Sequence, residues 1–123
     1  MTEEVKRACA ESRQQVPDSI AQIAAVIYNS LAECYASTVK EIEGLTHKNY
    51  EYIHIVGGGA NAGYLNELTA NATRKTVYAG PTEATAIGNI ASQMIADGKL
   101  KDLKAARRCI FDSFEIKEYN PDL

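Results

Sequence analysis

The sequence predicts an α/β fold in which a few parallel strands are flanked by helices. Two segments rich in β-branched and aromatic residues, 50–56 and 75–79, are each followed by a segment with helical periodicity. Strands that alternate with helices are typical of parallel pairing through crossover helices. A length of 123 residues suits one domain. Because two strands alone do not form a stable sheet, we expect the chain to be one piece of a larger α/β domain.

Two helices are predicted before the first strand. The first covers residues 2–15, with Thr2 as its N-cap, and ends before Pro17. Asp18 is the expected N-cap of a long second helix, whose apolar residues recur at helical spacing over about 24 positions. Gly44 is the expected end of this helix, because glycine is favoured just past a helix C-terminus.

The remainder of the chain is predicted to form two strands, each followed by a helix, and then one further helix. These elements fall, in chain order, at residues 50–56, 64–72, 75–79, 82–96 and 102–111. Thr82 is the expected N-cap of the fourth of them. Gly88 within that helix lowers helix propensity, so we expect it to pack closely against the glycine-rich turn described below. The tail at 119–123 is expected to be irregular.

Composition and charge exclude several classes of protein. The formal net charge is −3, from 13 Lys+Arg and 16 Asp+Glu, so the chain has no basic footprint for nucleic acid. No apolar stretch reaches the roughly 18 residues of a membrane span, and the acidic N-terminus is not a signal peptide. The three cysteines lie far apart, which argues against a disulfide framework or a zinc site. We therefore expect a cytoplasmic protein without membrane or nucleic-acid partners.

The most informative motif is the run Gly57-Gly58-Gly59 at the end of the first strand. Ligands of open α/β sheets bind at the carboxyl ends of strands, and a glycine turn there can hold a nucleotide against bare backbone. The alternative is a tight turn packed on a neighbouring helix.

A phosphate-binding Walker loop is excluded, because no Gly-Lys-Ser/Thr follows. An NAD-type dinucleotide-binding module stays open, since Gly57, Gly59 and Ala62 match its G-x-G-x-x-A pattern. The acidic residue that this pattern requires at the end of the second strand is missing, and Glu83 lies just beyond it, at a helix start.

Three segments together resemble a known family. They are the strand and glycine turn at 53–59, the run Tyr-Leu-Asn-Glu-Leu at 64–68, and the segment Val-Tyr-Ala-Gly-Pro-Thr-Glu-Ala-Thr-Ala-Ile-Gly-Asn-Ile at 77–90. In this order and spacing they resemble the C-terminal domain of FGGY-type carbohydrate kinases, closest to the branch that phosphorylates L-rhamnulose. The resemblance implies an actin-like, ribonuclease H-like ATPase fold. In this family two such domains enclose a cleft, with ATP between them and the sugar deeper inside.

The resemblance also implies which residues bind the cofactor. Gly57, Gly58 and Gly59 would form the adenosine-binding turn, with Gly58 closest to the nucleotide. Many members carry an asparagine where this chain has Ala62, so Asn61 is the nearest substitute to line the adenine pocket. Asn66 is a weaker candidate. ATP or ADP, with Mg²⁺ in the full-length parent, would be the cofactors, and no catalytic residue or metal ligand is assigned within this chain.

The whole chain, residues 1–123, is therefore expected to be the C-terminal, adenosine-binding fragment of a two-domain sugar kinase. It would meet the sugar only through an N-terminal domain that it lacks, and the isolated fragment is expected to be inactive. A third alternative is a non-catalytic fragment that associates with itself. On the long helix Tyr28, Leu31 and Tyr35 share a face, and we expect this seam to be partly exposed and able to form a homodimer.

Overall fold

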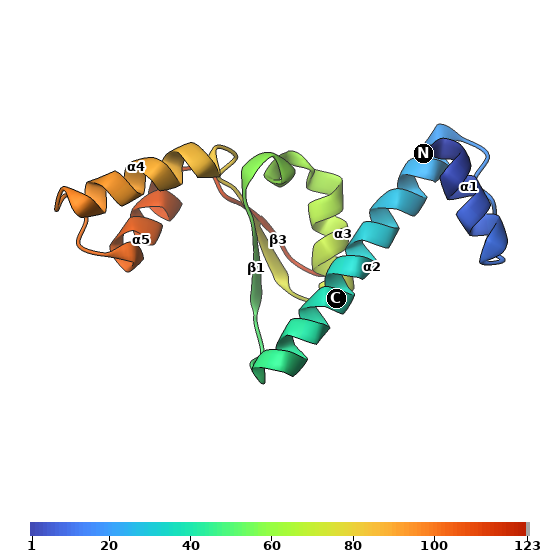
Figure 1. Cartoon of the computed structure of the whole chain (residues 1–123), viewed down its shortest axis with the longest axis horizontal. Helices are drawn as coiled ribbons and strands as arrows, with labels where there is room; N and C mark the ends of the chain where they lie inside the picture. The colour runs from blue at the N-terminus through green and yellow to red at the C-terminus, as the bar shows by residue number, and fades with distance from the viewer. Residues whose placement is uncertain (123) are drawn as a thin grey trace.

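The computed structural model describes residues 1–122 and combines helices with a small three-stranded sheet (Figure 1). The elements, in chain order, are α1 (Thr2–Glu11), α2 (Ile20–Thr46), β1 (Tyr52–Ile55), a 3₁₀ turn η1 (Gly57–Asn61), α3 (Gly63–Thr73), β2 (Thr76–Ala79), α4 (Ala84–Ala96), α5 (Leu103–Ser113) and β3 (Lys117–Tyr119). The predicted α/β class is confirmed. No helix among the described residues is both long enough and apolar enough to cross a membrane.

The sheet has the order β1-β2-β3. β1 and β2 are parallel, with Ile55 opposite Ala79, and α3 is the crossover between them. This confirms the predicted parallel pair. β3 was not predicted, because the tail was expected to be irregular, yet it pairs antiparallel with β2 and places Lys117 opposite Ala79. The short tail therefore extends the sheet on the side of β2 away from β1.

One face of the sheet carries the core. α2 and α3 lie together on this face (Figure 1). Val77 and Ala79 of β2 and Ala70 of α3 are buried, as are Ala32 and Ala36 of α2. The small residues let α2 and α3 approach each other and the sheet closely, which gives a thin core suited to a chain of this size.

The first two helices differ from the predicted ones at their ends. α1 stops at Glu11 rather than near residue 15, and its N-cap position is Met1, without a side-chain bond. α2 is capped by Ser19 and not by Asp18: the Ser19 Oγ accepts from the Gln22 backbone N–H at 3.2 Å. Either residue type suits an N-cap, so the pattern alone could not choose between neighbours.

The C-terminal end of α2 and the start of α4 also differ from the prediction. α2 continues through Gly44 and ends at Thr46, and His47 is its left-handed C-cap with φ of 53°. α4 begins at Ala84, and Glu83 rather than Thr82 holds its N-cap position, without a side-chain bond. A Cβ at Gly88 would have no heavy atom within 4 Å outside its own helix, so the expected close packing of Gly88 against the glycine turn is wrong.

The helices α4 and α5 form a pair that lies to one side of the sheet, opposite to α1 (Figure 1). α5 begins at the predicted place, where Asp102 accepts from the Ala105 backbone N–H at 2.8 Å. Its C-terminal end leads through an extended Phe114 directly into β3. The segment between α5 and β3 therefore returns to the carboxyl ends of β1 and β2, where the glycine turn lies.

Candidate functional site

The glycine turn follows β1 and is joined to the turn that follows β2. The Gly57 backbone N–H donates to the Pro81 carbonyl at 3.0 Å, and the Gly80 N–H donates to the Ile55 carbonyl at 2.8 Å. Gly57 has φ of +77°, a conformation that a side chain disfavours, so a glycine is required here by the backbone. The two turns at the carboxyl ends of the parallel strands thus form one hydrogen-bonded unit.

The other two glycines are not required by the fold. A Cβ at Gly58 would meet nothing within 4 Å, and one at Gly59 would lie 3.8 Å from the Ile55 Cγ2, an ordinary contact. Gly58 is also exposed. The fold therefore gives no internal reason for glycine at position 58, whereas close approach of a ligand to bare backbone would supply one.

Asn66 is a buried residue whose side chain supports the glycine turn. Its side chain is 1% exposed, and the Nδ2 donates to the Ala60 carbonyl at 3.0 Å from beneath the 3₁₀ turn. Buried polar groups are stable when they are hydrogen-bonded, and this bond holds the turn against the start of α3. Asn66 therefore positions the turn from within the protein.

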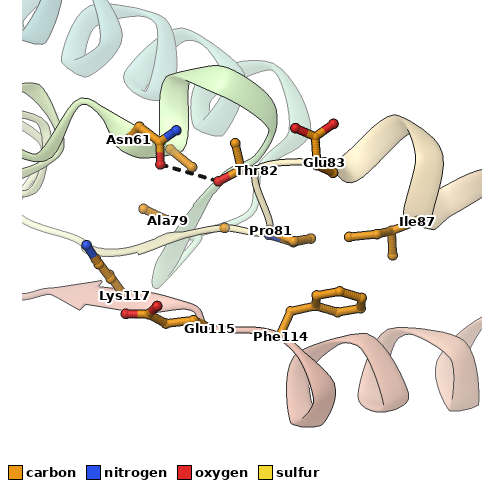
Figure 2. Close-up of a pocket in the computed structure, with 11 residues that line it drawn as sticks. Asn61, Ala79, Pro81, Thr82, Glu83, Ile87, Phe114, Glu115 and Lys117 are labelled. Carbon is orange, nitrogen blue, oxygen red and sulfur yellow. Dashed lines mark hydrogen bonds between the residues drawn. The ribbon is translucent and has the colours of Figure 1, made fainter.

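A pocket of about 300 Å³ opens between the two joined turns and the segment that leads into β3 (Figure 2). This volume lies at the lower end of the range for small-molecule sites. It is lined by Ala60, Asn61, Ala79, Gly80, Pro81, Thr82, Glu83, Ile87, Phe114, Glu115 and Lys117. The Thr82 Oγ1 donates to the Asn61 Oδ1 at 3.3 Å across its rim.

The pocket combines a polar half with an apolar half. Asn61 and Thr82 lie on one side, while Pro81, Ile87 and Phe114 face one another on the other side (Figure 2). The charged side chains that line it are two carboxylates, Glu83 and Glu115, and one ammonium, that of Lys117. This mixture suits an uncharged ligand with apolar faces and a polar edge better than a polyanion.

The predicted site residues are only partly brought together. Asn61 lines the pocket, whereas Gly57, Gly58 and Gly59 form the turn beside it and do not line it. Thr82 was predicted as a helix cap, but its hydroxyl bonds to Asn61 instead. Its place could have been inferred from the rule that neighbouring parallel strands end at the same sheet edge.

The groups whose pKa is clearly shifted lie away from this pocket. Enclosure against its neighbours raises the pKa of Tyr78, with smaller contributions from the Glu118 carboxylate and Tyr52. Tyr78 belongs to the face of the sheet opposite α3, where it stacks with His54 at 5.4 Å between ring centroids. No cluster of three or more metal-ligating side chains occurs within residues 1–122.

Comparison with known protein families shows to which family the chain belongs. Residues 5–96 match the family described as "FGGY family of carbohydrate kinases, C-terminal domain". The chain belongs to this family. Within the FGGY domain the match includes β1, the glycine turn, β2 and α4, and it ends before α5 and β3.

Individual FGGY relatives match over almost the whole chain. A rhamnulokinase of Bacillus subtilis (strain 168) is 46% identical over 121 residues, which are 98% of this chain and 25% of that protein. The rhamnulokinase of Enterococcus faecalis (strain ATCC 700802 / V583) is 46% identical over 125 residues, with 98% and 25% covered. That of Halalkalibacterium halodurans (strain C-125) is 44% identical over 119 residues, with 97% and 26% covered.

The chain spans about a quarter of the length of these FGGY relatives. Membership in a family of carbohydrate kinases gives no support to the alternative of an NAD-type dinucleotide-binding module. It confirms the resemblance that the three sequence segments indicated, and with it the actin-like ATPase fold of which the sheet and its helices are part.

Proposed function

We propose that residues 1–123 are the adenosine-binding part of a rhamnulokinase, an enzyme that phosphorylates L-rhamnulose at its 1-hydroxyl with ATP in the catabolism of L-rhamnose. One observation carries the proposal. In a chain 35–46% identical to rhamnulokinases, the turns after two parallel strands are bonded together beside a pocket of about 300 Å³. This is the edge of an α/β sheet where ligands bind.

The glycine turn supplies the backbone side of the proposed site. Gly58 is exposed, and its missing side chain leaves open space, so it is the glycine that a nucleotide can approach most closely. Asn61 is the polar side chain of the same turn that reaches the pocket, where its amide can bond to the edge of a base. Gly57 and Gly59 lie on either side of Gly58 in the proposed adenosine-binding turn, and Gly57 holds the left-handed conformation that the turn needs.

ATP or ADP is the ligand that we propose, with Mg²⁺ bound alongside the phosphates in the full-length parent. We assign the metal no ligand in this chain. The two carboxylates in the pocket oppose a triphosphate inside it, so the nucleoside end is the part of ATP that we place there.

The rest of the reaction would be carried by the remainder of the enzyme. Phosphoryl transfer depends mainly on the positioning of both substrates and on stabilisation of charge. The sugar, its contacts and the catalytic aspartate belong, by this proposal, to the N-terminal domain. We therefore expect the purified 123-residue chain to show no phosphorylation of L-rhamnulose, and measurable turnover would contradict this division of roles.

Calorimetric titration with Mg-ATP, with NAD as the control ligand, tests the nucleotide site. The expected result is binding of ATP alone, in the millimolar range, since the chain provides one side of the cleft. The variant Gly58→Val tests the turn, because its new side chain meets no protein atom near its Cβ but occupies the space next to the exposed backbone. ATP binding should weaken at least tenfold while the urea midpoint changes little.

Gly88→Ala is the matched control, since position 88 is equally open but lies within α4, away from the turn. It should leave ATP binding unchanged. Binding of NAD in place of ATP would favour the dinucleotide alternative. Full ATP affinity in Gly58→Val would contradict the assignment of this glycine to the nucleotide.

Two further features belong to the proposal. The three cysteines are free in the structure, which suits the reducing cytoplasm where we place the enzyme. The seam of Tyr28, Leu31 and Tyr35 on α2 leaves each side chain 37–38% exposed, and we propose that it pairs with a second copy of the chain.

A further inference from the structure

One wall of the pocket comes from a part of the chain that the family match does not include. Phe114, Glu115 and Lys117 line the pocket, and all three follow residue 96, where the match to the FGGY domain ends. Phe114 and Glu115 belong to the segment that connects α5 to β3, and Lys117 is the first residue of β3. This wall therefore lies outside the part of the chain that the family pattern describes.

The segment is held tightly against the end of β2. A Cβ at Gly80 would lie 2.7 Å from the Glu115 carbonyl oxygen, so the two backbones approach each other as closely as a glycine allows. The antiparallel pairing places Lys117 opposite Ala79, two residues before Pro81. The Phe114 backbone N–H donates to the Ile110 carbonyl at 3.1 Å, which ties the residue to the end of α5. The backbone at Phe114 is thus fixed from both sides.

The Phe114 ring faces Pro81 and Ile87 across the apolar half of the pocket (Figure 2). The residue is nevertheless 44% exposed, so a large part of this ring is not covered by the protein itself. Asn61 and Thr82 lie at the polar end of the same space. A flat ligand with apolar faces and a hydrogen-bonding edge would cover the ring and reach both polar side chains.

We propose that Phe114 is a specificity-determining residue of the nucleotide site, whose ring packs on the face of the purine base. The inference rests on the proposed function. In this arrangement Pro81 and Ile87 contact the base from the other side, and Asn61 bonds to its edge. The ribose and phosphates then extend toward the exposed glycine turn, away from the carboxylates of Glu83 and Glu115.

Titrations of the 123-residue chain with Mg-ATP, Mg-CTP and tripolyphosphate test this role. The variant Phe114→Ala should raise the Kd for ATP about tenfold, the typical loss when an aromatic ring that stacks on a base is removed. It should leave tripolyphosphate unaffected and reduce the preference for ATP over CTP. Phe114→Tyr keeps the ring and should bind ATP as the original chain does.

Phe111→Ala is the matched control. Phe111 is 48% exposed and lies one turn earlier on α5, but its ring contacts Tyr78 on the other face of the sheet. It should not change ATP binding or the preference between bases. Because Phe114 also borders the space between α4 and α5, the urea midpoint of each variant is measured alongside.

The outcomes separate this inference from the proposed function. If the original chain binds ATP and Phe114→Ala binds it equally well, the role of Phe114 is overturned while the nucleotide site stands. Equal weakening of ATP and tripolyphosphate would also overturn it, because a purely structural effect would not depend on the base. If the original chain binds none of the nucleotides, the proposed function fails and the inference fails with it.

Discussion

Gly80 is the residue on which the arrangement of the pocket most depends. Its φ of +131° lies in a region that side chains rarely adopt, and its Cα faces the backbone of the segment that leads into β3. A Cβ there would lie 2.7 Å from the Glu115 carbonyl oxygen and 3.4 Å from the Ile116 Cα. Backbone atoms cannot move aside as a flexible side chain can, so the clash would have to displace β3 or the turn.

We predict that Gly80→Ala lowers the free energy of unfolding by about 2–4 kcal/mol, from backbone strain and the loss of close packing. Urea denaturation followed by circular dichroism measures this change. Gly88→Ala is the control, because its Cβ is unobstructed and alanine favours a helix interior by up to about 1 kcal/mol. The close packing inferred for Gly80 is wrong if both variants shift the midpoint in the same direction.

Glu43 and Lys75 join α2 to the start of β2. Their side chains are 20% and 12% exposed, with 2.7 Å between the Lys75 Nζ and the Glu43 Oε1. The same oxygen accepts from the Tyr50 backbone N–H at 2.9 Å, and the Lys75 Nζ also donates to the Tyr50 carbonyl. The bonds from Lys75 and Tyr50 hold the pKa of Glu43 below its ordinary value of 4.5.

A lowered carboxyl pKa makes stability depend on pH in a defined direction. The contribution of Glu43 is complete above its ordinary value of 4.5 and is lost as the pH falls from there through the lowered value of the folded state. We predict that Glu43→Gln is less stable than the original chain at pH 6 and that this difference shrinks at pH 3. Urea midpoints across this range measure it.

Glu41→Gln is the control for this titration, since Glu41 is an exposed carboxylate on the same helix. It should follow the original chain across the range. A constant difference between Glu43→Gln and the original chain from pH 6 to pH 3 would show that the Glu43 charge does not contribute to stability.

At the scale of elements, α4 and α5 depend on each other more than on the sheet. They pack together at one side of the structure, whereas α2, α3 and the strands share the core (Figure 1). Of α4, only Ala91 is buried, and of α5 only Ala106. Elements with little buried apolar surface open at low free energy, independently of the core.

We predict that amides of α4 and α5 exchange with deuterium faster than those of α3 and β2. Removing the N-cap of α5 with Asp102→Ala should cost this helix about 1 kcal/mol and speed its exchange about fivefold. Mass spectrometry of exchanged peptides measures both effects. The rate for α3 in the same sample is the internal control, and equal protection of α5 and α3 would contradict an independently opening pair.

The elements that sequence could predict are those with a strong periodic pattern. The long helix, both parallel strands and the helix between them follow from apolar spacing and from β-branched residues. β3 could not be predicted, because three residues, Lys117-Glu118-Tyr119, carry no alternation and pair only through tertiary contact with β2. The predicted start of α2 was wrong for a related reason, since Asp18 and Ser19 are equally suitable N-caps and the sequence pattern does not choose between them.

The candidate site could likewise be predicted only where a residue pattern marks it. The glycine turn was found because three successive glycines are costly without a purpose. The position of Thr82 beside Asn61 follows from the rule that neighbouring parallel strands end side by side. The position of Phe114 depends on how the tail folds back onto the sheet, which a tail without a pattern does not show. The buried role of Asn66 was likewise hidden, because an asparagine at the start of a helix suits a ligand and a structural bond equally.

The molecule as a whole leaves apolar surface on two sides. On α2 the seam of Tyr28, Leu31 and Tyr35 is partly uncovered, with Tyr28 in edge contact with Tyr64 at 5.7 Å between ring centroids. On the sheet face opposite α3, Tyr52 and Tyr78 pack together at 5.6 Å, and Tyr52 is 52% exposed. Parallel strands are usually covered on both faces, so this exposure favours association.

We predict that the seam on α2 mediates dimerisation and that light scattering of the purified chain gives twice the mass of 13.4 kDa. Leu31→Glu places a charge at the centre of the seam and should yield a monomer, because an unpaired charge is costly to bury. Leu45→Glu is the control, since Leu45 lies on the same helix but is 83% exposed and outside the seam. A dimer that persists in Leu31→Glu but not in a Tyr52→Glu variant would move the interface to the open face of the sheet.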